Sequence, residues 1–99
     1  MNWRSTAFLR LAKGQPCYLQ LGPCADRETV VPAHSNSSRH GRGFSFKSHD
    51  LFTVPACASC HAALDHGTRL TREEKREAFQ QAWERWMLHL FQTGQVMVT

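Results

Sequence analysis

Two cysteines, a histidine and an aspartate lie close together in segment 57–65 of this chain. Cys57 and Cys60 are separated by two residues, a spacing at which a tight turn presents both sulfurs to one metal ion in tetrahedral geometry. If a helix begins near residue 57, His61 and Asp65 lie on one face of it, where they could share a second site. The segment therefore predicts metal binding.

The two other cysteines, Cys17 and Cys24, form a wider pair earlier in the chain. In a reducing compartment, four cysteines are more typical of metal ligands or free thiols than of disulfides. Cys17 and Cys24 are the simplest partners for Cys57 and Cys60, although their spacing is wider than the usual two to four residues. We expect one structural zinc on all four sulfurs, with no coordination position left for water.

Residues 57–61 also have the spacing of a c-type haem attachment motif. Haem attachment of that kind goes with export, and the first residues of the chain contain no apolar run typical of a signal peptide. It would also leave Cys17 and Cys24 unexplained. We therefore favour zinc over haem.

The length of 99 residues and the net charge of +4 limit the classes of protein to be considered. A chain of this length forms one domain, 1–99, with a modest core that a metal crosslink would stabilise. No stretch approaches the roughly 18 apolar residues of a membrane span. We expect a soluble cytoplasmic protein with no membrane partner.

A basic strip without any acidic residue runs from Thr29 to His49 and contains Arg39, Arg42 and Lys47. Such a strip is typical either of a solvated loop or of a surface that binds phosphates. The neighbouring metal cluster favours the second interpretation.

Two short extended segments are expected around this strip. The β-branched residues of 29–34 predict a strand with His34 at its far end. Apolar residues across 44–54 predict a second extended stretch that returns beside the first, and 17–24 reads as a short extended piece ending in a turn. The outline is a hairpin with a long basic loop. Segment 3–12 has no clear periodicity.

Two helices are expected after the hairpin. A short one covers about 57–65 and stops at Gly67, and a longer one covers about 71–93. Thr71 and Glu74 have the spacing of a capping box at its start. Its apolar stripe, which includes Trp83 and Trp86, is typical of a core-facing helix. The tail 95–99 is expected to pair as an edge strand.

The order of four motifs carries a family resemblance. They are Gly14-Gln15-Pro16-Cys17, Val31-Pro32-Ala33-His34, Asp50-Leu51-Phe52 and Cys57-Ala58-Ser59-Cys60-His61 with Asp65. This order resembles the HNH, or ββα-metal, nucleases with a cysteine zinc scaffold, and more narrowly the YbcO-like nucleases of phages and prophages. The resemblance covers roughly residues 10–66.

The resemblance implies an α+β fold with a ββα-metal core over about 17–66 and an additional C-terminal helix. It implies a metal-dependent endonuclease acting on DNA, in which His34 is the general base and His61 ligates a catalytic Mg²⁺ or Mn²⁺. Asp50 occupies the position of the middle Asn of HNH, where it could orient His34 or bind the metal. Arg39, Arg42 and Lys47 would then hold phosphates.

The sequence departs from the HNH pattern at Ala33, where many members have a metal-ligating carboxylate, and at Asp50. The missing ligand could come from Asp50, Asp65 or His66. These departures keep open a zinc-stabilised nucleic-acid-binding module without catalysis. A third alternative is an interaction protein whose long helix docks a partner through Trp83 or Trp86.

Overall fold

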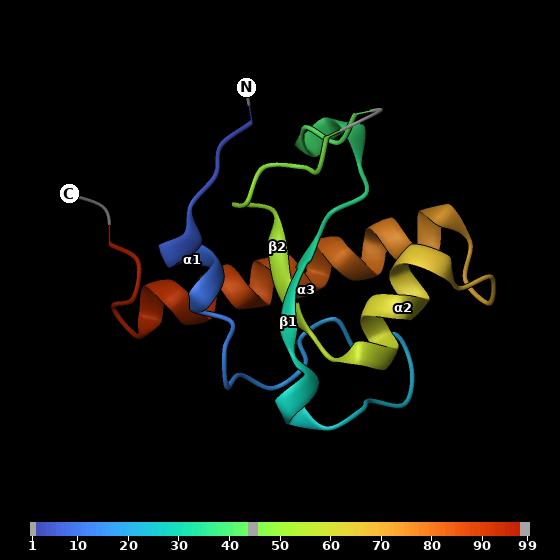
Figure 1. Ribbon diagram of the computed structural model, residues 1–99, viewed down its shortest axis with the longest axis horizontal. Helices are drawn as coiled ribbons and strands as arrows, with labels where there is room; N and C mark the ends of the chain where they lie inside the picture. Colours follow the sequence, from blue (N-terminus) through green and yellow to red (C-terminus); the bar gives the residue numbers. More distant parts are fainter. Residues whose placement is uncertain (1, 44–45, 98–99) are drawn as a thin grey trace.

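A two-stranded antiparallel sheet lies at the centre of the computed structural model, which describes residues 2–43 and 46–97 (Figure 1). Strands β1 (Val31–His34) and β2 (Thr53–Ala56) pair so that Val31 faces Ala56 and His34 faces Thr53. All four residues of β2 are buried. The register places His34 at the end of the sheet nearest the loop that joins the strands.

Helix α2 (Ala58–His66) follows β2 directly, with Cys57 as its N-cap residue. The amide of Gly67 donates a hydrogen bond to the Ala63 carbonyl and ends the helix. A Cβ atom at residue 67 would lie 2.5 Å from that carbonyl oxygen, so only glycine fits there. The predicted short helix and its stop are confirmed to within one residue.

Helix α3 (Arg72–Gln92) packs against β2 and crosses the molecule behind the sheet (Figure 1). The predicted capping box is present: the Thr71 hydroxyl accepts from the Glu74 amide at 3.0 Å, and the Glu74 carboxylate accepts from the Thr71 amide at 2.8 Å. Trp86 is 2% exposed and belongs to the core, as its place on the apolar stripe predicts. Partner docking through Trp86 is therefore excluded in the folded protein.

The strand prediction for 29–34 is correct only from Val31 onward. Residues Arg27–Thr29 form a 3-10 turn, η1, in which the Thr29 amide and hydroxyl both donate to the Asp26 carbonyl. The side-chain bond gives Thr29 a local alternative to strand pairing. β propensity alone did not reveal this competition.

The second extended stretch, predicted across 44–54, is mostly irregular. Phe44 lies outside the described residues, Phe46 forms an isolated bridge with Gly43, and the strand begins only at Thr53. The reason is a turn at Asp50, where the Phe52 amide donates to the His49 carbonyl and the Thr53 hydroxyl donates to the Asp50 carbonyl. A second short turn, η2 (Ser38–His40), lies in the basic strip.

The predicted edge strand of the tail is wrong for the described residues 95–97. The amides of Gln95 and Val96 both donate to the Leu90 carbonyl, so the chain folds back on the end of α3 instead of pairing with the sheet. Residues 98–99 lie outside the described part of the chain.

Near the N-terminus, segment 3–12 contains a short helix, α1 (Thr6–Arg10), that begins at Ser5. The result is a small α+β domain with a two-stranded sheet and helices. Within the residues that the structure describes, no helix is long and apolar enough to cross a membrane.

Candidate metal centre and catalytic groove

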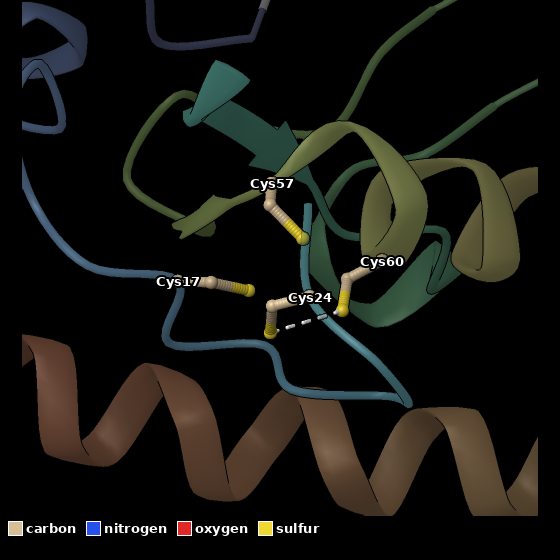
Figure 2. Close-up of side chains that lie close together, drawn as sticks. All are labelled: Cys17, Cys24, Cys57 and Cys60. Atoms are coloured by element: carbon tan, nitrogen blue, oxygen red, sulfur yellow. Dashed lines mark hydrogen bonds between the residues drawn. The ribbon is translucent and has the colours of Figure 1, made fainter. Parts of the chain in front are cut away.

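The four cysteines converge in space, as the sequence predicts. Cys17 and Cys24 lie on the N-terminal loop, and Cys57 and Cys60 lie at the start of α2 (Figure 2). All four sulfur atoms are within 4.8 Å of one another. They therefore lie close enough to hold a metal ion such as zinc.

One sulfur pair has the spacing expected of tetrahedral zinc ligands. Zinc–sulfur bonds of about 2.3 Å place tetrahedral sulfurs about 3.8 Å apart, and the Cys24 and Cys60 sulfurs are 3.9 Å apart. Three backbone amides also point at sulfur atoms. Those of Gln20 and Leu21 donate to Cys17 and Cys60 at 3.4 and 3.3 Å, and that of Ala25 donates to Cys57 at 3.3 Å. Amide donors of this kind stabilise thiolates, the form of cysteine that binds metal.

Two thiols of the cluster have pKa values that are shifted in opposite directions. Desolvation raises the pKa of the Cys57 thiol, but hydrogen bonds from Ser59, Cys60 and Ala25 outweigh it and bring the pKa to about 6. Desolvation of the Cys24 sulfur, together with its neighbours Cys17 and Cys60, raises its pKa to about 12. One thiolate is therefore favoured, whereas several adjacent thiolates require a bound positive charge.

His34 and Asp50 form the second feature of the site. His34 Nε2 lies 2.8 Å from Asp50 Oδ1, and the Asp50 side chain is only 4% exposed. The other carboxylate oxygen accepts from the Ser5 amide at 2.8 Å. Asp50 thus lies behind His34 as a partner of its imidazole.

The Asp50 carboxyl is held in its ionised form. Burial raises its pKa, but hydrogen bonds from His34 and the Ser5 amide, together with the charges of His34 and Arg4, outweigh burial and leave the pKa below its ordinary value. An ionised carboxylate can only accept hydrogen bonds. The proton in the bond to His34 therefore lies on His34 Nε2.

His61 and Asp65 lie on one face of α2, as predicted, with His61 Nε2 and Asp65 Oδ2 3.2 Å apart. Asn36, in the loop after β1, donates its side-chain amide to Asp65 Oδ1 at 3.2 Å. This bond links the loop that follows β1 to α2. Both His61 and Asp65 are more than a third exposed and are accessible to a ligand.

A groove of about 1690 Å³ collects most of the predicted residues. His34, His61, Asp65 and His66 line it, as do Arg39, Arg42 and Lys47 of the basic strip. Asp50 does not line the groove and instead contacts His34 from the protein side. The four cysteines lie outside the groove as a separate cluster.

Sequence reasoning missed the part of the groove lining that comes from α3, which includes Arg72, Lys75 and Arg76. Their i, i+3, i+4 spacing places them on one face of the helix, a signal that was available in the sequence. Arg and Lys residues in the groove outnumber its Asp and Glu residues by six to three: Arg39, Arg42, Lys47, Arg72, Lys75 and Arg76 against Asp65, Glu73 and Glu77.

Trp83, predicted to be core, also lines the groove and donates its indole N–H to the Leu51 carbonyl at 2.8 Å.

Comparison with known families identifies the family of this chain. A family model described as "Putative nuclease YbcO" matches residues 6–95. The chain belongs to the YbcO family. Membership supports a nuclease-like function at a coarse level, that is, a hydrolase acting on nucleic acids.

The YbcO fold is also found in a solved structure. It is described as a "putative bacteriophage protein from Escherichia coli str. K-12 substr. MG1655", with a TM-score of 0.65 and 22% sequence identity. The similarity covers 88% of this chain and 99% of that chain, and at this identity it shows the fold alone. No curated protein shows significant similarity to the chain.

Proposed function

We propose that this YbcO-family protein is a metal-dependent endonuclease of the HNH type that hydrolyses phosphodiester bonds of DNA. The observation that carries the proposal is the groove in which His34, backed by Asp50, lines the same surface as His61 and Asp65. The strand–strand–helix order of β1, β2 and α2 supports an HNH-like core.

His34 is the general base in this mechanism. Its Nε2–H is bound to Asp50, which leaves Nδ1 to accept a proton from water. As the O–H bond of water breaks, the proton passes to Nδ1 and the oxygen forms a bond to phosphorus. The bond between phosphorus and the 3′ oxygen breaks, and Asp50 stabilises the imidazolium that results.

His61 and Asp65 would hold the divalent ion, Mg²⁺ or Mn²⁺. Their facing atoms are 3.2 Å apart at the groove, and one carboxylate with a few other ligands fits Mg²⁺, which keeps several waters and binds substrate phosphates. Such an ion supplies positive charge to the scissile phosphate and the leaving oxygen. The Asn36 side chain fixes the orientation of Asp65.

A structural zinc on the four cysteines would anchor the N-terminal loop to the start of α2. It would thereby hold in place the helix that carries His61. A four-thiolate site also fits a reducing compartment such as the cytoplasm.

The basic residues that line the groove support DNA as the substrate. Arg39 and Lys47 of the basic strip are exposed there, as are Arg72 and Arg76 of α3. Contacts of this kind bind phosphates, so the affinity should fall with salt and depend little on sequence.

Nicking of supercoiled plasmid by the zinc-loaded protein tests the proposal. Nicks should form with Mg²⁺ or Mn²⁺, carry 5′-phosphate and 3′-hydroxyl ends, and vanish with His61→Ala while the zinc content is unchanged. Cleavage that persists when divalent ions other than the bound zinc are removed would contradict the mechanism.

A non-catalytic, zinc-stabilised nucleic-acid-binding module is the second candidate. The observation that favours it is that, across residues 2–43 and 46–97, the four cysteines are the one group of three or more potential ligands close enough to share an ion. DNA binding without cleavage under any divalent ion would select this function.

A further inference from the structure

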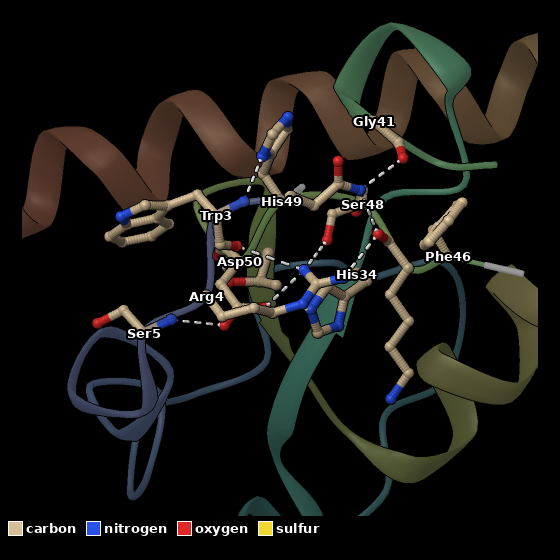
Figure 3. A network of polar contacts seen from close by, with 12 residues as sticks. Trp3, Arg4, Ser5, His34, Gly41, Phe46, Ser48, His49 and Asp50 are labelled. Atoms are coloured by element: carbon tan, nitrogen blue, oxygen red, sulfur yellow. Dashed lines mark hydrogen bonds and ion pairs between the residues drawn. The ribbon is translucent and has the colours of Figure 1, made fainter.

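The N-terminal strap, residues 2–5, lies against residues 47–50, near the end of the sheet that carries His34 (Figure 3). The Trp3 amide donates to His49 Nδ1 at 2.8 Å, and the Asp50 amide donates to the Trp3 carbonyl at 3.0 Å. Asn2 adds side-chain bonds to the carbonyls of Gly41 and Lys47 at 2.7 and 2.8 Å. The strap is therefore bonded along its length to the segment that presents Asp50.

Arg4 is the centre of this contact. Its Nη1 lies 3.2 Å from Asp50 Oδ1 and also donates to the Ser48 carbonyl, and its Nη2 donates to the Lys47 carbonyl at 2.8 Å. The planar guanidinium fixes the carboxylate and two carbonyls of the same segment together, which a flexible ammonium group cannot do in the same way.

The same Asp50 oxygen that contacts Arg4 accepts from His34 Nε2. The position and ionisation of Asp50 therefore determine which ring nitrogen of His34 carries the proton. Without the Arg4 contact the Asp50 carboxylate would keep the Ser5 amide on its other oxygen but would be less fixed in its orientation toward Nε2. A carboxylate that turns away from Nε2 no longer favours the Nε2–H tautomer of His34.

We infer that Arg4 is a positioning residue of the active site, which acts through Asp50 to hold His34 with its Nε2 protonated and its Nδ1 free. The family model matches from residue 6 onward, so this contact involves residues outside the matched region. The inference rests on the proposed function for its catalytic consequence, but not for its effect on the tautomer of His34.

The test compares Arg4→Gln with Arg10→Gln in the zinc-loaded protein. Arg10 is an exposed arginine at the end of α1 that does not line the groove, so its variant is a matched control. Long-range ¹H–¹⁵N NMR of the histidine rings reports the tautomer of His34, with its resonances assigned from His34→Ala. Plasmid nicking kinetics with Mn²⁺ report kcat and KM.

Arg4→Gln should convert His34 from the Nε2–H tautomer to a mixture, and lower kcat by roughly tenfold with KM changed by less than about twofold. Arg10→Gln should match the wild type in both. An unchanged His34 tautomer in Arg4→Gln would overturn the inference, as would a raised KM at unchanged kcat, which would make Arg4 a phosphate-binding residue.

The role of Arg4 can also be tested if the wild-type protein does not cleave DNA or if Arg4→Gln does not fold. If the wild-type protein cleaves no DNA, the proposed function fails while the tautomer comparison still decides the role of Arg4. If Arg4→Gln does not fold, Arg4→Lys carries the same comparison. It keeps the charge but lacks the planar fork, and we expect an intermediate loss of the Nε2–H tautomer.

Discussion

His34 Nε2 and Asp50 Oδ1 lie 2.8 Å apart, at the end of β1 and in the turn that precedes β2. The bond joins the two sides of the long connection between the strands. The HNH resemblance left two roles open for Asp50, orienting His34 or binding the metal. The contact with His34 favours the first.

Asp50→Asn tests this pairing directly. An amide can donate to Nε2 and favour the wrong tautomer of His34, so kcat for plasmid nicking should fall by roughly 10²–10⁴-fold with little change in DNA affinity. Steady-state kinetics and a binding titration measure the two effects separately. A variant that cleaves as fast as the wild type would remove Asp50 from the mechanism.

The ionised state of Asp50 predicts a pH dependence of stability. Because the folded-state pKa lies below its ordinary value of 3.8, the stabilisation is fully present above that value and is lost as the pH falls through the lower folded-state pKa. Urea unfolding of the wild type and of Asp50→Asn should give a stability difference that shrinks as the solution is acidified below about pH 4. Comparing the two proteins removes the contribution of acid release of zinc, which both share. A difference that grows with acidification would contradict the sign.

Cys57→Ser tests the cysteine cluster. The variant should bind about zero zinc ions per chain instead of about one, and should unfold at lower denaturant concentration because the metal no longer joins the N-terminal loop to α2. Elemental analysis and urea unfolding measure both effects. His61→Ala is the matched control and should retain its zinc; if it lost zinc as Cys57→Ser does, the two metal sites would not be separate.

The cysteine cluster also shows which parts of the site the sequence could predict. The short spacing of Cys57 and Cys60 predicts a shared site, and the two other cysteines of the chain are its simplest partners. The structure confirms that the four sulfurs lie together. The start of α3 was predicted for a similar reason, because Thr71 and Glu74 satisfy each other locally.

The sequence did not predict contacts that depend on how distant loops fold together. Nothing in the types or spacing of Arg4 and Asp50 indicates that they meet, since their contact requires the whole connection between β1 and β2 to turn back. The same holds for Thr29, whose side-chain bond to Asp26 replaces strand pairing. The basic face of α3 was visible in the spacing of Arg72, Lys75 and Arg76, but its place in the same groove as Arg39 follows only from the packing of α3 on β2.

The α3 wall of the groove predicts a salt-dependent effect. Arg76→Ala should weaken DNA binding to a similar degree on unrelated sequences and reduce the slope of log Kd against log salt concentration by roughly one. Fluorescence anisotropy over a salt series measures this. Lys13→Ala, which removes an exposed charge outside the groove, should leave the slope unchanged. Equal slopes for Arg76→Ala and the wild type would place the DNA elsewhere.

The proposal that His34 activates water at a metal-dependent phosphodiesterase site is tested by the rate of plasmid nicking by His34→Ala with saturating Mn²⁺. His89→Ala, which removes a histidine stacked on Trp86 and outside the groove, is the control. We expect His34→Ala to lower the nicking rate by roughly 10²–10⁴-fold while zinc content and DNA affinity are retained, and His89→Ala to cleave DNA at nearly the wild-type rate. Equal cleavage by His34→Ala and the wild type would contradict it.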